Sequence, residues 1–286
     1  ARGAGVKPIL GAELVMEPEV SGGPTSRIIV LIQSQQGYLS LAEILARMWT
    51  ADNIKGAQCS WAWLQELSDG LIALSGAQAG PVGQALLQGN EMAARTSALR
   101  LASLFPHRFY IELQRAGRSD DETHVSAAVA LAANLKLPVV ATHPVQFNKP
   151  SDCESHEARV CIAEGETLGN KKRIKRFTQD QYLKSSAEME ALFADVPSAL
   201  ANTVEIAKRC SVTLQLGKHF LPDFPTPNGM PIGEFFRQAS YEGLEERLLL
   251  LFPDQAKRDA ERPKYVERLE FELGIILKMD FPGYFL

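Results

Sequence analysis

The sequence has few cysteines, and they follow no motif. Its 286 residues contain four of them, Cys59, Cys153, Cys161 and Cys210, which lie far apart and form no Cys-x-x-Cys pair. This spacing argues against a disulfide framework and against a cysteine-ligated zinc site. It favours reduced thiols in a cytoplasmic protein.

Long hydrophobic runs and strong net charge are also missing. No apolar run approaches the roughly 18 residues of a membrane span, and no signal peptide is visible, so we expect no membrane partner. The formal net charge is -4, so any contact with nucleic acid has to be local. No P-loop, Gly-x-Gly-x-x-Gly turn or nucleophile elbow occurs. The remaining class is an ordinary globular protein.

Apolar runs do alternate with helical periodicity in the first half of the chain. The pattern predicts strands at residues 8–16, 27–33, 70–75, 108–114 and 137–142. Helices are expected between them, at 38–49, 61–67, 92–105 and 120–136. Such alternation indicates an α/β fold with a parallel sheet or barrel.

The stretch from Leu137 to Asn148 has the organisation of a site. Its first six residues form a continuous apolar run, typical of a strand buried on both faces of a parallel sheet. Polar side chains follow at the end of this strand: Thr142, His143, Gln146 and Asn148. Ligands of α/β folds bind at the carboxyl ends of such strands.

The second half of the chain shows no convincing strand. Its periodicity predicts helices at 152–163, 179–184, 187–194 and 198–209, followed by long helices at 232–252 and 258–279. Between these groups, residues 221–231 contain four prolines, which indicates a domain boundary.

Several motifs, in order along the whole chain, match one family. They are Val6-Lys-Pro-Ile-Leu-Gly-Ala-Glu13, Gly37-Tyr38, Gly70-Leu-Ile-Ala-Leu-Ser-Gly76, Phe109-Tyr-Ile-Glu-Leu113, Leu137-Pro-Val-Val-Ala-Thr142, Ala201-Asn-Thr-Val-Glu-Ile-Ala-Lys-Arg-Cys210, Leu221-Pro-Asp-Phe-Pro225 and Phe281-Pro-Gly-Tyr-Phe-Leu286. With them the chain resembles the catalytic alpha subunits of bacterial replicative DNA polymerase III.

The resemblance implies a domain plan. Residues 1–215 would be an N-terminal PHP domain (polymerase and histidinol phosphatase type), a (β/α)7 barrel that here lacks its first strands. Residues 216–231 would be a proline-rich linker, and residues 232–286 the helical start of the polymerase core. Both ends of the chain look cut, so we interpret it as a piece of a longer protein.

The resemblance also identifies a remnant metal rim at Glu13, Glu112 and His143. Metal-binding members carry further ligands at positions where this chain has Ala116, Pro144 and Gln146, and Arg27 stands where many of them have a histidine. A cation in a metal pocket opposes metal binding through Coulomb repulsion. We therefore expect no metal on this rim. We also expect Arg27 or another cation to pair with Glu13 or Glu112, at a cost of about 3 kcal/mol if one side of a partly buried pair is removed.

One cluster of basic residues stands out between two predicted helices. It comprises Lys171, Lys172, Arg173, Lys175 and Arg176. These side chains are candidates for contacts with DNA phosphates. The alternative is a solvated loop balanced by the acidic residues around it, and the sequence leaves both interpretations open.

These features predict a fragment of a DNA-directed DNA polymerase that has no catalytic residues and no cofactor of its own. Mg²⁺ would be bound further along the parent protein. The implied partners are DNA, the proofreading exonuclease subunit and other replicase subunits, with the PHP domain acting as a scaffold. The alternative from another class is a stand-alone, metal-dependent PHP phosphoesterase, which would need an Asp or His ligand around residues 143–146.

Overall fold

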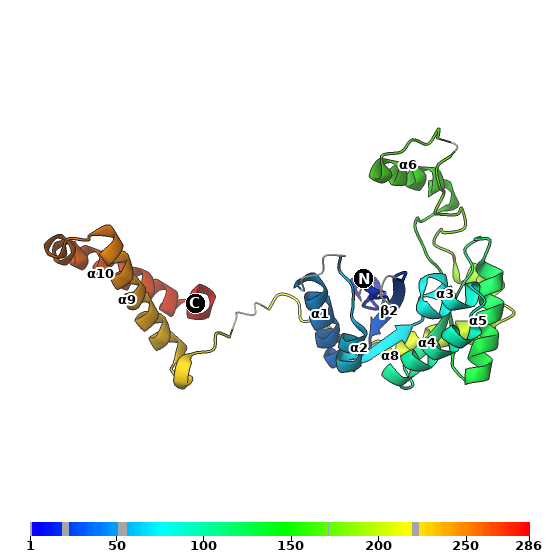
Figure 1. Ribbon diagram of the computed structural model, residues 1–286, viewed down its shortest axis with the longest axis horizontal. Helices are drawn as coiled ribbons and strands as arrows, with labels where there is room; N and C mark the ends of the chain where they lie inside the picture. Colours follow the sequence, from blue (N-terminus) through cyan, green and yellow to red (C-terminus); the bar gives the residue numbers. More distant parts are fainter. Residues whose placement is uncertain (1, 19–22, 51–55, 171, 219–222) are drawn as a thin grey trace. The chain divides into compact units, whose positions relative to one another are not determined.

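The chain forms two compact units, residues 1–213 and 214–286. The computed structural model describes residues 2–18, 23–50, 56–170, 172–218 and 223–286 (Figure 1). Each unit is considered separately below.

The first unit is built on a five-stranded sheet with the order β1-β2-β3-β4-β5. The strands are β1 (Gly11–Met16), β2 (Ser26–Ile32), β3 (Leu71–Leu74), β4 (Phe109–Gln114) and β5 (Val139–Thr142). All five overlap the predicted strands. Strands β3 and β4 are almost entirely buried, as expected for apolar runs that are covered on both faces.

The expected parallel arrangement holds for only part of the sheet. β3, β4 and β5 run parallel, but β1 pairs antiparallel with β2 and β2 pairs antiparallel with β3. Only residues 17–25 connect β1 to β2, whereas a parallel pair needs a crossover of a dozen or more residues. The sheet is therefore mixed.

The two faces of the sheet have different chemistry. Leu14, Ile28, Ile111 and other alternate residues point into the main core, with Phe105 and Phe193 among its largest fully buried side chains. The opposite face carries a smaller apolar cluster of Ile72, Leu74, Tyr110 and Val140, which packs against Ile206 and Cys210.

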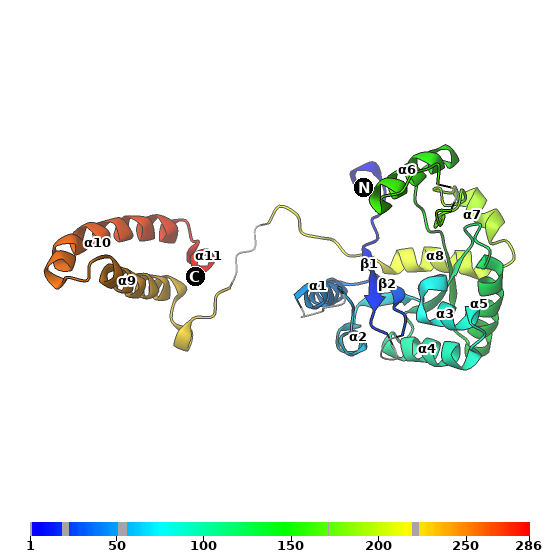
Figure 2. The ribbon, with the colours of Figure 1, turned by 45° about the horizontal axis from the view of Figure 1, so that its top comes forward.

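The first unit also contains helices, most of which pack around this sheet (Figure 2). They are α1 (Gln35–Thr50), α2 (Trp61–Leu67), α3 (Pro81–Leu87), α4 (Glu91–Leu104), α5 (Asp121–Leu135), α6 (Cys153–Glu164), α7 (Ser186–Leu192) and α8 (Pro197–Arg209), with short turns η1 (Arg2–Ala4), η2 (Ala77–Ala79) and η3 (Pro150–Asp152). Helix α8 packs on β5 and supplies Ile206 to the smaller cluster. All predicted helices but one are confirmed within a few residues.

The prediction of a helix at residues 179–184 was wrong. This segment pairs with the backbone that follows β5, through Gln146 N–H to the Gln181 carbonyl (2.8 Å) and Leu183 N–H to the Phe147 carbonyl (2.9 Å). Long-range pairing thus overrides the local helical pattern. Helix α3 was missed, although Pro81 at its first position is a typical helix start.

Between the paired segments, residues 148–177 leave the body of the first unit and return to it. We call this excursion the arm. It contains α6, which stands apart from the sheet in Figure 1. At its base, His156 is buried with ring contacts to Phe147 and Phe177.

The second unit is helical. It contains η4 (Pro227–Gly229), α9 (Ile232–Leu251), α10 (Gln255–Lys278) and α11 (Pro282–Phe285). Arg237 pairs with Glu270 across α9 and α10, with Nη1 to Oε1 at 2.6 Å. Among the described residues of the whole chain, no helix has the length and apolar composition needed to cross a membrane.

Candidate functional site

The polar site lies on the sheet face opposite the main core. Residues in β4 alternate, so Ile111 and Leu113 enter the core while Glu112 projects from the other face. A cavity of about 250 Å³ opens there, and we call it the rim pocket. It is lined by Glu13, Arg27, Ile29, Gly76, Gln78, Ala79, Glu112, Gln114, Arg118, Pro144, Gln146, Phe177 and Gln181.

The mixed topology explains how Arg27 reaches this pocket. Because β2 runs against β3, its first residues lie at the same edge as the carboxyl end of β3. In the register of β1 and β2, Glu13 faces Ile29, which makes Arg27 its diagonal neighbour on the same face. Arg27 Nη1 lies 2.5 Å from Glu13 Oε1.

The predicted approach of Arg27 to Glu13 is therefore confirmed, but the pair is not buried. The side chain of Arg27 is 54% exposed to solvent and that of Glu13 is 49% exposed. The expected cost of about 3 kcal/mol was argued for a partly buried pair, and an exposed pair is worth less than about 1 kcal/mol.

Glu112 is the buried acid of the pocket, with no solvent exposure. Its Oε1 accepts hydrogen bonds from Thr142 Oγ1 (2.5 Å) and Gln114 Nε2 (3.1 Å), whereas Oε2 has no hydrogen-bond partner among the described residues. Burial raises the pKa of Glu112, the two hydrogen bonds oppose this effect, and the charge of Glu13 adds to it. Burial therefore favours the neutral acid.

His143 is not among the residues that line the rim pocket. Its Nε2 lies 2.8 Å from the carbonyl oxygen of Asp180, so this nitrogen carries the proton and donates. Partial burial lowers the pKa of His143. This hydrogen bond connects the end of β5 to the segment that follows the arm, at Asp180.

Asp121, the first residue of α5, holds two residues of the pocket wall through hydrogen bonds that the sequence analysis missed. The buried carboxylate of Asp121 accepts from the backbone N–H of Ala116 (2.6 Å), that of Arg118 (3.0 Å) and Gln78 Nε2 (2.7 Å). Gln78 and Arg118 follow the carboxyl ends of β3 and β4. Polar residues at such positions are candidates for a functional site, so the sequence did contain a signal for them.

The donor set does not fit a metal ion. Glu13 is paired with Arg27, Glu112 is hydrogen-bonded within a buried network, and Pro144 and Gln146 occupy the lining where further ligands would be needed. No group of three or more His, Cys, Asp or Glu side chains suited to a metal occurs among the described residues. All four cysteines are free thiols, and burial raises the pKa of Cys59 to about 12.

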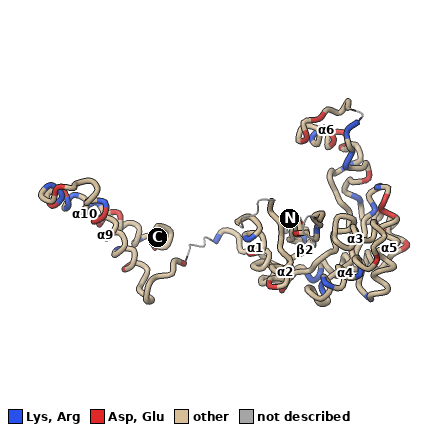
Figure 3. The backbone as a smooth tube through the Cα atoms, in the orientation of Figure 1, with Lys and Arg blue, Asp and Glu red and all other residues tan. Residues whose placement is uncertain are grey.

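Within the arm, the basic cluster is divided between internal and exposed positions. Arg173 forms an ion pair with Glu157 of α6, and both side chains are about nine-tenths buried. Arg176 pairs with Glu164 at 3.2 Å, while Lys172 and Lys175 are exposed and Lys171 lies outside the described residues. Figure 3 shows acidic and basic positions together around α6. Arg173 is thus a structural residue of the arm.

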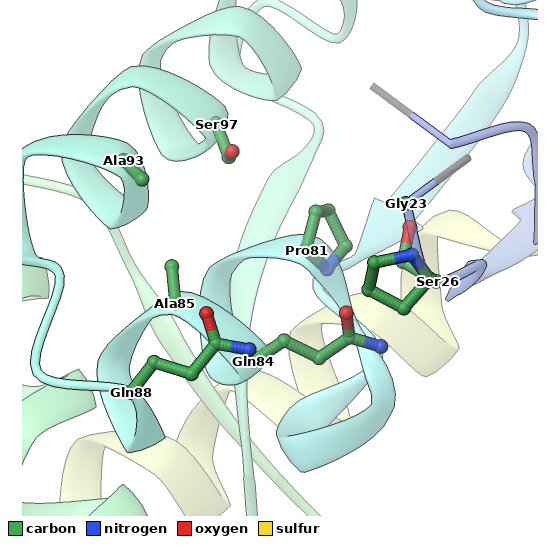
Figure 4. A pocket seen from close by; sticks show the side chains of 9 residues that line it. Gly23, Ser26, Pro81, Gln84, Ala85, Gln88, Ala93 and Ser97 are labelled. Atoms are coloured by element: carbon green, nitrogen blue, oxygen red, sulfur yellow. The ribbon is translucent and has the colours of Figure 1, made fainter. Parts of the chain in front are cut away.

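A second hollow, of about 220 Å³, lies beside α3 and α4 (Figure 4). Its lining is Gly23, Pro24, Ser26, Pro81, Gln84, Ala85, Gln88, Ala93 and Ser97, none of which titrates. Gln84 is held by its hydrogen bonds to the carbonyls of Thr25 and Ala79. This hollow lacks the charged groups that the rim pocket has.

Comparison with known proteins adds the evolutionary context of this site. The PHP domain family matches residues 1–116. Over 288 residues the chain is 51% identical to the DNA polymerase III subunit alpha of Pseudomonas aeruginosa, covering 100% of this chain and 25% of that protein. The corresponding protein of Neisseria meningitidis serogroup B is 49% identical over 290 residues, with the same coverage. That of Escherichia coli K12 is 45% identical over 285 residues, covering 99% of the chain and 24% of the relative.

Proposed function

We propose that this chain serves as a metal-free scaffold within a DNA polymerase III alpha subunit. It is homologous to such subunits along its whole length, and the PHP domain family matches its residues 1–116. The chain spans about a quarter of the length of the curated relatives it matches. DNA-directed DNA synthesis, its Mg²⁺ and its contacts with DNA and other replicase subunits in the cytoplasm are therefore proposed for the whole protein.

We propose the same domain plan as from the sequence. Residues 1–215 form the PHP domain as a (β/α)7 barrel without its first strands, residues 216–231 the linker and residues 232–286 the start of the polymerase core. This proposal is supported by Glu13, Arg27 and Glu112, which all project from one face of the sheet, the face opposite the main core.

The observation that carries the metal-free proposal is the Arg27–Glu13 pair in the rim pocket. The guanidinium supplies positive charge where metal-binding relatives place a cation, and its repulsion opposes a second one. The alternative, a metal-dependent PHP phosphoesterase, has less support because His143 bonds to Asp180 and because Pro144 and Gln146 offer no acidic or imidazole ligand. Metal analysis after dialysis separates the two. Stoichiometric zinc or manganese that is lost in His143→Ala would establish the alternative.

A domain freed from metal chemistry can serve as a docking platform, and we propose the proofreading exonuclease subunit as its partner. Titration of the full chain with that purified subunit should give a saturable 1:1 complex by calorimetry and size exclusion. Its absence under conditions in which a full-length relative forms one would refute the docking role. The metal-free proposal would be unaffected.

A further inference from the structure

The part of the arm that leads back to the sheet is fixed at both of its ends by side chains. We call residues 172–177 the return segment. Near its start, Arg173 forms the buried ion pair with Glu157 of α6. At its end, the ring of Phe177 packs edge to face on buried His156, with ring centroids 4.8 Å apart. The position of the segment is therefore set before any partner binds.

The peptide groups between these two anchors have no partners of their own. Residues 174–178 form no helix, turn or strand. Within the described part of the chain, the backbone N–H and C=O groups of residues 174–177 make no hydrogen bond. None of these residues has a positive φ, which would prevent strand pairing. A row of unpaired peptide groups is a template for pairing with another chain.

The solvent-facing side chains of the return segment are basic, with one apolar residue among them. Lys172 and Lys175 are exposed and form no ion pair with any described residue. The side chain of Arg176 is 65% exposed beside Glu164, so water screens that pair. Ile174 is 80% exposed. The segment thus presents positive charge around an isoleucine that nothing covers in the described structure.

This combination favours an acidic peptide over a nucleic acid as the ligand. Phosphates could neutralise the lysines, but they cannot form a ladder with peptide N–H and C=O groups. Binding of single strands also uses aromatic rings that stack on bases, and the one aromatic residue of the segment, Phe177, is packed on His156. A peptide strand satisfies the peptide groups, its carboxylates meet Lys172 and Lys175, and an apolar side chain covers Ile174.

We propose that the return segment binds an extended acidic segment of a partner protein by strand addition. Backbone hydrogen bonds to residues 174–177 provide affinity, while Ile174 and the two lysines select a partner strand that combines apolar and acidic side chains. Because both ends of the segment are already fixed, ordering it on binding costs little conformational entropy. This proposal names a surface and a chemistry, and it is independent of the metal-free rim and of the exonuclease as a partner.

The test is fluorescence anisotropy of the full chain with the labelled peptide Glu-Val-Glu-Val-Glu-Val-Glu at constant ionic strength. We expect saturable binding that Lys172→Glu with Lys175→Glu weakens by about tenfold or more, because attraction becomes repulsion. Ile174→Ser should weaken it several-fold, since apolar surface is no longer covered. Lys264→Glu with Lys278→Glu, at two exposed lysines of α10, is the matched control and should leave binding unchanged.

A modified peptide tests strand pairing without depending on how any variant folds. The same peptide N-methylated throughout keeps its charges but cannot donate backbone hydrogen bonds, so it should bind at least about tenfold more weakly. Equal binding of this peptide would mean that charge alone attracts it, and would overturn strand addition. No binding of the unmodified peptide, or unchanged binding by the lysine variant, would also overturn the proposal. Binding of a single-stranded oligonucleotide in place of the peptide would assign the lysines to nucleic acid instead.

Discussion

Arg27, Glu13 and Glu112 show how far side-chain environment changes the role of similar groups. Glu13 and Glu112 both lie on the sheet face opposite the main core. Glu13 is half exposed beside a guanidinium, whereas Glu112 is fully buried. The first is an ordinary surface ion pair, and the second is an acid whose pKa burial raises.

The energetic coupling of Arg27 and Glu13 should be small. A double-mutant cycle with Arg27→Ala and Glu13→Gln should give a coupling free energy of unfolding below about 1 kcal/mol, because water screens both groups. Urea denaturation of the four proteins measures it. A coupling of about 3 kcal/mol would mean that the pair is desolvated in solution.

Glu112 should make folding stability depend on pH. Its pKa is raised in the folded state above the ordinary value of 4.5, so its stabilising contribution is complete below that value and is lost as the pH rises through the folded pKa. In Glu112→Gln, stability should therefore fall less as the pH rises above about 4.5. Glu190→Gln, at an exposed position of α7, is the matched control. Parallel pH profiles for all three proteins in denaturant titrations would contradict the assignment.

At the scale of elements, tight contacts between chain segments hold the first unit together. Gly76 follows β3 with a positive φ of 79°, and a Cβ on this residue would lie 1.9 Å from the carbonyl oxygen of Arg27. Residue 76 therefore has to be glycine if the backbone of Arg27 is to stay in its observed position.

Replacing this glycine should lower thermal stability. We expect Gly76→Ala to reduce the melting temperature by several degrees, since both the backbone conformation and the contact with Arg27 are strained. Gly169→Ala, where an added Cβ meets open space, should leave it nearly unchanged. Equal melting temperatures by circular dichroism would show that the turn can relax.

The arm should depend on its internal ion pair. Glu157→Gln removes the charge that faces the buried guanidinium of Arg173, so amide hydrogen exchange should accelerate in residues 153–177 and not in the sheet. Glu154→Gln, at an exposed position of the same helix, should change neither region. If exchange in the arm stays slow, the pair does not hold it.

The same pair decides how the DNA hypothesis must be tested. Neutralising Arg173 would disturb the arm, so the variant should be Lys172→Ala with Lys175→Ala, both exposed. If these lysines contact phosphates, the slope of log affinity against log salt should fall by roughly 0.9 for each lost contact with duplex DNA. An unchanged slope in fluorescence anisotropy would favour the solvated-loop interpretation.

For the whole molecule, the two compact units differ in how much they bury. The first has an extensive core on one sheet face and a second cluster on the other, while the second unit buries mainly Phe236, Leu248, Leu273 and Pro282 among its described residues. Leu250 and Tyr284 are 75% and 69% exposed. The second unit therefore has less apolar burial with which to offset its conformational entropy.

Expressed separately, the two units should behave differently. Residues 1–213 should retain a cooperative unfolding transition, and residues 214–286 should show weak, non-cooperative loss of helix on heating. Circular dichroism of both pieces beside the full chain is the measurement. A sharp transition in the second piece would show that its few buried residues suffice.

The sequence alone determined the local features of this protein. Apolar periodicity located all five strands and most helices, and the substitutions at Pro144 and Gln146 indicated a changed rim. These properties depend on neighbouring residues, which a pattern records directly.

The tertiary structure decided how distant segments meet. It made the first two strand pairs antiparallel, and it turned residues 179–184 from a predicted helix into a paired segment. It brought Gln78 and Arg118 into the wall of the rim pocket, where both are hydrogen-bonded to Asp121. It also buried Arg173 against Glu157 and left the Arg27–Glu13 pair exposed. Burial and pairing depend on residues tens of positions apart, and their energies arise only when the folded chain removes water from between them.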